Sequence, residues 1–133
     1  MNTTSPRIAV LADDLIWSSR LVAAVQRAGA EPVRASTASE LEAILAGASI
    51  APLEVVVVDL NGRSYDAVEA VRSAVASGKT VISVGQHEDL ELRRRALAAG
   101  AHRVYSYNKL FRDGPEVIAG LLHAVAEPRA SEG

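Results

Sequence analysis

The feature that most constrains the fold is a run of four valines that no polar residue interrupts. The run, VVVV at 55–58, ends on Asp59. A strand with one face in water alternates apolar and polar side chains, whereas a strand that is buried on both faces is apolar throughout. Strands of the second kind occur mainly in parallel sheets that helices cover on both faces. The valines therefore predict an interior strand of an α/β sheet, with Asp59 at its end.

A strand-like segment followed by a helix-like segment occurs five times along the chain. The strand-like segments are residues 7–12, 31–35, 53–58, 80–84 and 102–106. Apolar residues at helical spacing follow each of them, and the last helix is expected to begin at Asp113, before Pro115 and Glu116. Five such units with right-handed crossovers predict a doubly wound, flavodoxin-like (βα)5 sandwich of three layers. Its parallel sheet is expected to have the strand order 2-1-3-4-5.

The composition is typical of a globular chain. Of its 133 residues, 49% are hydrophobic and 23% are charged, and we expect one domain over 1–126 with a frayed tail over 127–133. The net charge of −2 gives no reason to expect a nucleic acid or a membrane as partner. The absence of cysteine excludes disulfides and thiolate metal sites. Neither a secretory signal pattern nor a membrane-spanning run of roughly 18 apolar residues is present, so a cytoplasmic protein is expected.

Three aspartates follow two strands that are neighbours in the expected sheet. Asp13 and Asp14 come after the first strand, and Asp59 ends the third. Ligands of doubly wound sheets bind at the carboxyl ends of these two strands, where the strand order reverses. Carboxylates so close repel one another unless a cation neutralises them, and Mg²⁺ prefers such oxygen ligands. The alternative is that these aspartates only cap the helices and turns that follow.

The three aspartates and the order of the expected elements make the sequence over 7–125 resemble the receiver domains of bacterial two-component response regulators. The resemblance rests on LADDL after the first strand, on VVVVDL at the third and on ALAAGA (96–101) before the fifth. It implies that Asp13 and Asp14 are an acidic pair that binds magnesium. It also implies that Asp59 accepts a phosphoryl group from a histidine kinase, and that Asn61 offers its backbone carbonyl to the metal.

The sequence departs from this family at two positions of the expected pocket. Receiver domains carry a threonine or serine at the end of the fourth strand, where this chain has Gly85, and Ser83 is expected to form a local backbone hydrogen bond instead. They carry a lysine at the end of the fifth strand, where this chain has Tyr107. Lys109 is either a displaced pocket lysine or a solvated loop residue. We therefore expect an atypical or pseudo-receiver.

Three further features point to surfaces for a partner. Arg93, Arg94 and Arg95 form a basic patch on the fourth helix, which with Tyr105 of the fifth strand belongs to the face that receiver domains use for output and dimerisation. The alternative interpretation is that this patch is only a solvated helix face. Trp17 is either an exposed anchor for a partner or a cover for the core. His87, in the loop before the fourth helix, is either a ligand-contacting residue or plain surface.

These observations lead to three hypotheses on function. The first is a stand-alone receiver-like module that is not an enzyme and binds a protein partner, either a histidine kinase or an output protein, through the fourth helix, fifth strand and fifth helix. A homodimer through that face is left open. The second is a response regulator in which Asp59 accepts a phosphoryl group with the help of magnesium. Its only catalytic activity would be its own phosphorylation and dephosphorylation at Asp59. The third is a flavodoxin-like binder of a small molecule.

Overall fold

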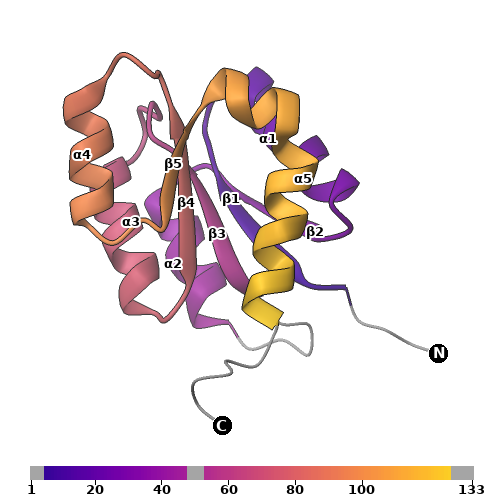
Figure 1. Cartoon of the computed structure of the whole chain (residues 1–133). Helices are drawn as coiled ribbons and strands as arrows, with labels where there is room; N and C mark the ends of the chain where they lie inside the picture. The colour runs from indigo at the N-terminus through magenta and orange to yellow at the C-terminus, as the bar shows by residue number, and fades with distance from the viewer. Residues whose placement is uncertain (1–4, 48–52, 127–133) are drawn as a thin grey trace, which may run out of the picture.

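The computed structural model describes residues 5–47 and 53–126 and shows a five-stranded parallel sheet between two layers of helices (Figure 1). The strands are β1 (Arg7–Leu11), β2 (Glu31–Ala35), β3 (Leu53–Asp59), β4 (Thr80–Gly85) and β5 (Arg103–Ser106). Their order is β2-β1-β3-β4-β5, and every neighbouring pair is parallel, so the predicted topology is confirmed. The expected tail over 127–133 lies outside the described residues.

Five helices alternate with the strands, as predicted. They are α1 (Leu15–Arg27), α2 (Ala38–Ala46), α3 (Ala67–Ala76), α4 (Leu90–Ala98) and α5 (Tyr107–Ala126). Helices α1 and α5 pack on one face of the sheet, and α2, α3 and α4 cover the other. Within the described ranges, no helix is long and apolar enough to cross a membrane.

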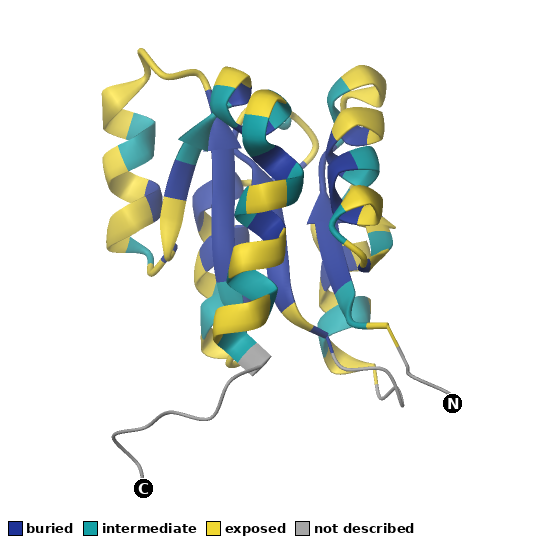
Figure 2. Cartoon of the chain, turned by 45° about the vertical axis from the view of Figure 1, so that its right-hand side comes forward, coloured by how far each residue is buried: buried dark blue, intermediate teal, exposed yellow. Residues whose placement is uncertain are grey.

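The four valines of β3 divide their side chains between the two halves of the core. Val55 and Val57 pack with α1 and α5, whereas Val56 and Val58 pack with the helices of the other face. All four are almost fully buried, as the dark central strands in Figure 2 show. This burial on both faces explains why the run contains no polar residue. Asp59, the next residue, follows the same alternation and lies on the face that α1 and α5 cover.

The helix predicted from Asp113 is the second of two helical segments that meet at a kink in α5, and the sequence did not predict the first. Helix α5 begins six residues earlier, at Tyr107, and Asp113 is a non-helical break inside it, with φ −122° and ψ 16°. The hydroxyl of Ser106 accepts a hydrogen bond from the backbone N–H of Lys109 at 3.1 Å, which caps the early first turn. Pro115 lacks an N–H group and lies in the first turn after the break, so the sequence signal marked the start of the second segment.

Candidate functional site

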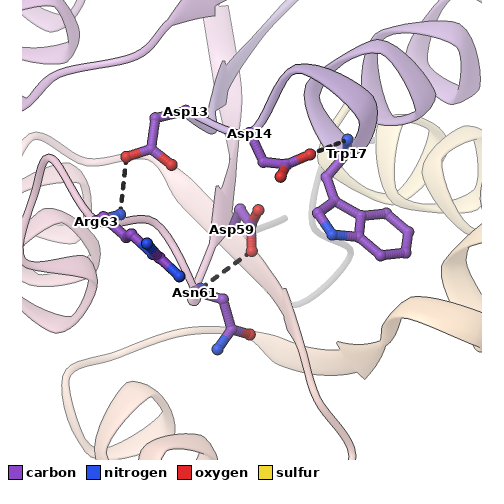
Figure 3. A pocket seen from close by; sticks show the side chains of 6 residues that line it. All are labelled: Asp13, Asp14, Trp17, Asp59, Asn61 and Arg63. Carbon is purple, nitrogen blue, oxygen red and sulfur yellow. Dashed lines mark hydrogen bonds between the residues drawn. The ribbon is translucent and has the colours of Figure 1, made fainter.

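A pocket of about 490 Å³ opens where β1 and β3 end (Figure 3). It is lined by Asp13, Asp14, Trp17, Asp59, Asn61 and Arg63. The structure thus brings together the three predicted carboxylates and Asn61, together with the predicted aromatic residue of α1. His87 does not line this pocket; its exposed side chain lies 3.5 Å from Glu88.

Asp13 and Asp14 each hold the backbone of a neighbouring segment. Oδ2 of Asp13 accepts hydrogen bonds from the N–H groups of Arg63, at 2.8 Å, and Ser64, at 2.7 Å. Burial raises the pKa of Asp13, but these hydrogen bonds outweigh it and hold the pKa below its usual value. Oδ1 of Asp14 accepts from the N–H groups of Ile16 and Trp17, both at 2.9 Å, and so caps α1. The capping alternative therefore describes Asp14 well.

Asp59 is only 1% exposed and is held by Tyr107. The Tyr107 hydroxyl donates a hydrogen bond to Oδ1 of Asp59, and the N–H of Asn61 donates to the same oxygen at 3.1 Å. Burial raises the pKa of Asp59, the two hydrogen bonds lower it in part, and the charges of Asp13 and Asp14 raise it further. The net effect is a raised pKa, so the folded protein holds a proton on this carboxyl group more readily than a free aspartate does.

The raised pKa predicts how Asp59→Asn changes stability. Below the pKa of a free aspartate the group is neutral whether folded or not. Its cost grows as the pH rises from that pKa to the higher pKa of the folded state, and it is fully present above the latter. Asparagine keeps an oxygen for Tyr107 and Asn61 but carries no charge. We expect Asp59→Asn to raise the free energy of unfolding at pH 7 by on the order of 1 kcal/mol. Urea unfolding of both proteins from about pH 4, near the pKa of a free carboxyl group, to about pH 7 should show this difference in stability growing with pH. A difference that shrinks as the pH rises would contradict the prediction.

Tyr107 is fixed in place by two other aromatic rings. Its ring stacks on Trp17 with centroids 4.3 Å apart, and Phe111 lies 4.8 Å from Trp17. The guanidinium of Arg20 lies 5.2 Å from the ring centre of Phe111 and 5.6 Å from that of Trp17. Burial raises the pKa of Tyr107, so its hydroxyl remains a neutral donor at physiological pH. Trp17 therefore packs over the core and at the same time forms one wall of the pocket.

Lys109 does not enter the pocket. Its ammonium Nζ lies 2.9 Å from Oδ2 of Asp113, within α5, and about half of the Lys109 side chain is exposed. The prediction that Lys109 replaces the pocket lysine is therefore not supported by its position. The hydrogen-bond donor beside Asp59 is the phenol of Tyr107, which the sequence identified only as a departure from the family pattern.

Gly85, at the position where receiver domains carry a hydroxyl residue, is closely packed. A Cβ atom on Gly85 would lie 3.3 Å from Cβ of Leu60 and 3.4 Å from Oδ1 of Asn61. Both residues belong to the loop after β3, which the hydrogen bond from the N–H of Leu60 to the carbonyl of Val84, at 2.8 Å, holds against β4. A side chain at this position would be tightly packed, and Leu60 and Asn61 would have to shift by a few tenths of an ångström to admit its Cβ atom.

Ser83 does not form the predicted local backbone bond. Its side chain is buried inside β4, and its Oγ has no hydrogen-bond partner in the described part of the chain. A buried hydroxyl without a partner costs about 1–3 kcal/mol. We expect Ser83→Ala to raise the free energy of unfolding by about 1 kcal/mol, as measured by urea unfolding.

Ser18→Ala is the matched control for this prediction. Ser18 is also buried, but its Oγ accepts a hydrogen bond from Nη2 of Arg34 at 2.8 Å. Removing this hydroxyl leaves a guanidinium N–H without its partner, so the same substitution should destabilise the protein at Ser18. Equal losses at both positions would contradict the interpretation that Ser83 lacks a partner.

Tyr65 holds the backbone of Asp59 from inside the core, a contact that the sequence did not predict. Its buried hydroxyl donates to the backbone carbonyl of Asp59 at 2.7 Å and lies 3.3 Å from that of Leu11. Its ring lies directly on Gly62, where a Cβ atom would come within 2.0 Å of Cζ. The only sequence signal for this contact is the glycine in NGRSY (61–65), because only a residue without Cβ leaves room for the ring.

The oxygen atoms of the pocket are the groups that could hold a magnesium ion. Across residues 5–47 and 53–126, no three or more histidine, aspartate or glutamate side chains lie close enough together to bind one ion. Asp13 and Asp14 each give one carboxylate oxygen to backbone N–H groups, and Asp59 gives one to Tyr107. The predicted ligands Asp13, Asp14, Asp59 and Asn61 surround one pocket but do not form a three-carboxylate coordination site.

The proposed partner face carries its predicted residues on α4 and β5. Arg93 is half-buried, whereas Arg94 and Arg95 are exposed, and Arg94 forms an ion pair with Glu91. Tyr105 is half-buried on β5, where it packs against the α1 and α5 half of the core. These positions leave at least part of the basic patch open to solvent.

No family model matches the sequence, and no curated protein matches it significantly. Solved structures do match. A CheY-like response regulator receiver domain protein from Methanospirillum hungatei JF-1 is 23% identical, with a TM-score of 0.74 over 91% of this chain and 96% of that one. A two-component response regulator from Clostridium difficile is 10% identical, with a TM-score of 0.76 over 92% and 99%. A response regulator from Burkholderia pseudomallei, solved with a phosphorylated aspartic acid and calcium, is 12% identical, with a TM-score of 0.66 over 92% and 75%.

These similarities cover 91% or 92% of the chain. At such low identities they establish the architecture and leave the chemistry of the pocket to the residues of this chain. The chain has the fold of the CheY-like response regulator receiver domains.

Proposed function

We propose that the chain is a receiver-type signalling module that acts by binding a protein partner and does not accept a phosphoryl group on Asp59. The observation that carries this proposal is the hydrogen bond from the Tyr107 hydroxyl to Asp59. This hydrogen bond engages one oxygen of the carboxylate that would accept the phosphoryl group. The proposal makes this chain a signalling protein and not an enzyme.

The charges around Asp59 also disfavour phosphoryl transfer. This reaction depends on positioning and on neutralising the negative charge of the transferred group. Three of the residues that line the pocket are aspartates, and Arg63 is the one cation among them. Tyr107, a neutral phenol, stands where receiver domains have a lysine, and the ammonium of Lys109 is paired with Asp113. A transferred phosphoryl group would thus meet like charges with little to balance them.

The surface of α4, β5 and α5 is the proposed site for the partner. Arg93 of α4 and the half-buried Tyr105 of β5 belong to these elements, as do two exposed leucines of α4, Leu90 and Leu97. Arg95 instead lines a pocket between α3 and α4. A histidine kinase or an output protein is the class of partner that the similar solved structures suggest, since they are described as response regulators.

Phosphorylation of Asp59 remains the second candidate because of one observation. Asp59 lines an open pocket beside Asp13 and Asp14, and the structure from Burkholderia pseudomallei with the same fold contains a phosphorylated aspartic acid. In that case the phosphoryl group would be placed on Oδ2, which accepts no hydrogen bond from a described residue, or Tyr107 would have to release Oδ1. The flavodoxin-like binder is the third candidate, and only the presence of the pocket supports it.

Intact-mass measurement after incubation with acetyl phosphate and Mg²⁺ separates the first two candidates. We expect the wild-type protein to keep its mass, because the atoms that would position and neutralise the phosphoryl group are missing. A phosphorylatable receiver domain treated in parallel shows that the reagent is active. A mass increase of one phosphoryl group in the wild type that is absent in Asp59→Asn would overturn the proposal.

A further inference from the structure

The exposed large apolar side chains of the described residues gather in two places. They are Leu15, Ile16, Leu90 and Leu97. Leu15 and Ile16 begin α1, and the two others lie on α4. These helices pack on opposite faces of the sheet (Figure 1). Each exposed pair carries an energetic cost in water that a partner would remove.

The first place is acidic. We call it the α1 tip, residues 13–16, which combines Asp13 and Asp14 with Leu15, 75% exposed, and Ile16, 64% exposed. Both carboxylates accept hydrogen bonds from backbone N–H groups, and no described cation forms an ion pair with them. The α1 tip therefore presents two apolar side chains beside two negative charges that form no ion pair with a described cation, although Arg63 lines the same pocket.

The second place is basic. We call it the α4 stripe, which consists of Leu90, Arg93, Arg94 and Leu97. Their spacing of three, four and seven residues puts them on one side of the helix. Leu90 is 68% exposed and Leu97 is 45% exposed. Arg94 pairs with Glu91 beside the stripe, whereas no described carboxylate forms an ion pair with Arg93. The stripe thus presents two apolar side chains with at least one free positive charge between them.

We propose that the α1 tip of one copy of this chain docks on the α4 stripe of a second copy. Each surface has two exposed apolar side chains, and their charges are opposite, so contact would bury both pairs and bring Asp13 and Asp14 toward Arg93. This inference rests on the proposed function in one respect, since α4 belongs to the proposed partner face, and it adds a second copy of this chain as a further occupant of α4.

The placement of the two surfaces determines the form of this assembly. Because they lie on opposite faces of the sheet, docking joins unlike surfaces and leaves one free α1 tip and one free α4 stripe at the ends. Association therefore continues beyond a dimer as the concentration rises. Four apolar side chains bury less area than the roughly 1,000 Å² of a stable interface, so the contact is weak and reversible.

Sedimentation equilibrium of four samples tests the inference. They are the wild type, a tip variant (Leu15→Ser with Ile16→Ser), a stripe variant (Leu90→Ser with Leu97→Ser) and an equal mixture of the two variants. From about 10 µM to about 1 mM, the average mass of the wild type should rise past that of a dimer, and added salt should lower it. Each variant alone should be a monomer. The mixture should form a dimer and stop, because it keeps one intact tip and one intact stripe per pair.

Two results would overturn the inference. The first is a wild type that remains a monomer over the whole range. The second is a wild type that associates while the mixture of variants remains monomeric, since the contact would then not join these two surfaces. Exposed leucines contribute little to folding, and thermal unfolding of both variants checks that they are folded. Neither result bears on Asp59, so the proposed function stands or falls separately, by the mass measurement.

Discussion

Tyr107→Phe is expected to lower the free energy of unfolding at pH 7 by about 1.5–3 kcal/mol. The substitution removes one oxygen and keeps the ring that stacks on Trp17. It leaves the buried carboxylate of Asp59 with the N–H of Asn61 as its remaining described donor. A hydrogen bond to a charged, buried group is worth more than one between neutral groups. Urea unfolding at pH 7 measures the change.

Tyr105→Phe is the matched control for this result. Tyr105 lies two residues earlier, is half-buried, and donates its hydroxyl to no residue in the described part of the chain. The same loss of one oxygen should there change the free energy of unfolding by less than about 0.5 kcal/mol. If the two substitutions had equal effects, the hydroxyl of Tyr107 would not be holding Asp59.

Gly62→Ala is expected to destabilise the protein by about 1–3 kcal/mol. A Cβ atom at this position would come within 2.0 Å of the Tyr65 ring, far inside van der Waals contact. The ring cannot move away freely, because its hydroxyl donates to the carbonyl of Asp59 at 2.7 Å. The substitution should therefore break this hydrogen bond and shift the backbone of Asp59, which urea unfolding and the intrinsic fluorescence of Tyr65 and its neighbours would report.

Gly120→Ala provides the comparison for the same added methyl group. Gly120 is exposed within α5, and a Cβ atom there would meet nothing within 4 Å. Alanine favours the helix more than glycine does, so this variant should be stabilised by about 0.5–1 kcal/mol. A neutral Gly62→Ala variant would show that Tyr65 does not lie against the loop.

The architecture could be predicted because its signals are local. The apolar run at 55–58 indicated burial on both faces, and the repeated strand and helix patterns gave the number of units. General rules of handedness and connection then fixed the strand order. The gathering of Asp13, Asp14 and Asp59 at one pocket followed from that order, because the carboxyl ends of neighbouring parallel strands meet.

The contacts that define the chemistry of the pocket could not be predicted in the same way. Tyr107 lies 48 positions from Asp59 in the sequence, and no pattern in either segment specifies which carboxylate its hydroxyl meets. Its placement depends on the early start of α5 and on stacking with Trp17 and Phe111. The contact of Tyr65 with Gly62 depends on the path of one loop. Such details depend on side-chain packing, which a periodic pattern does not encode.

The hydrogen bond from Tyr107 to Asp59 is the central claim, and a double-mutant cycle tests it most directly. The cycle compares the free energies of unfolding at pH 7 of the wild type, Tyr107→Phe, Asp59→Ala and the double variant. Residues that interact directly show non-additive effects. We predict a coupling energy of about 1–2 kcal/mol, with Tyr107→Phe costing little once Asp59 is alanine. Additive effects, with a coupling energy near zero, would contradict the claim that Tyr107 holds the carboxylate.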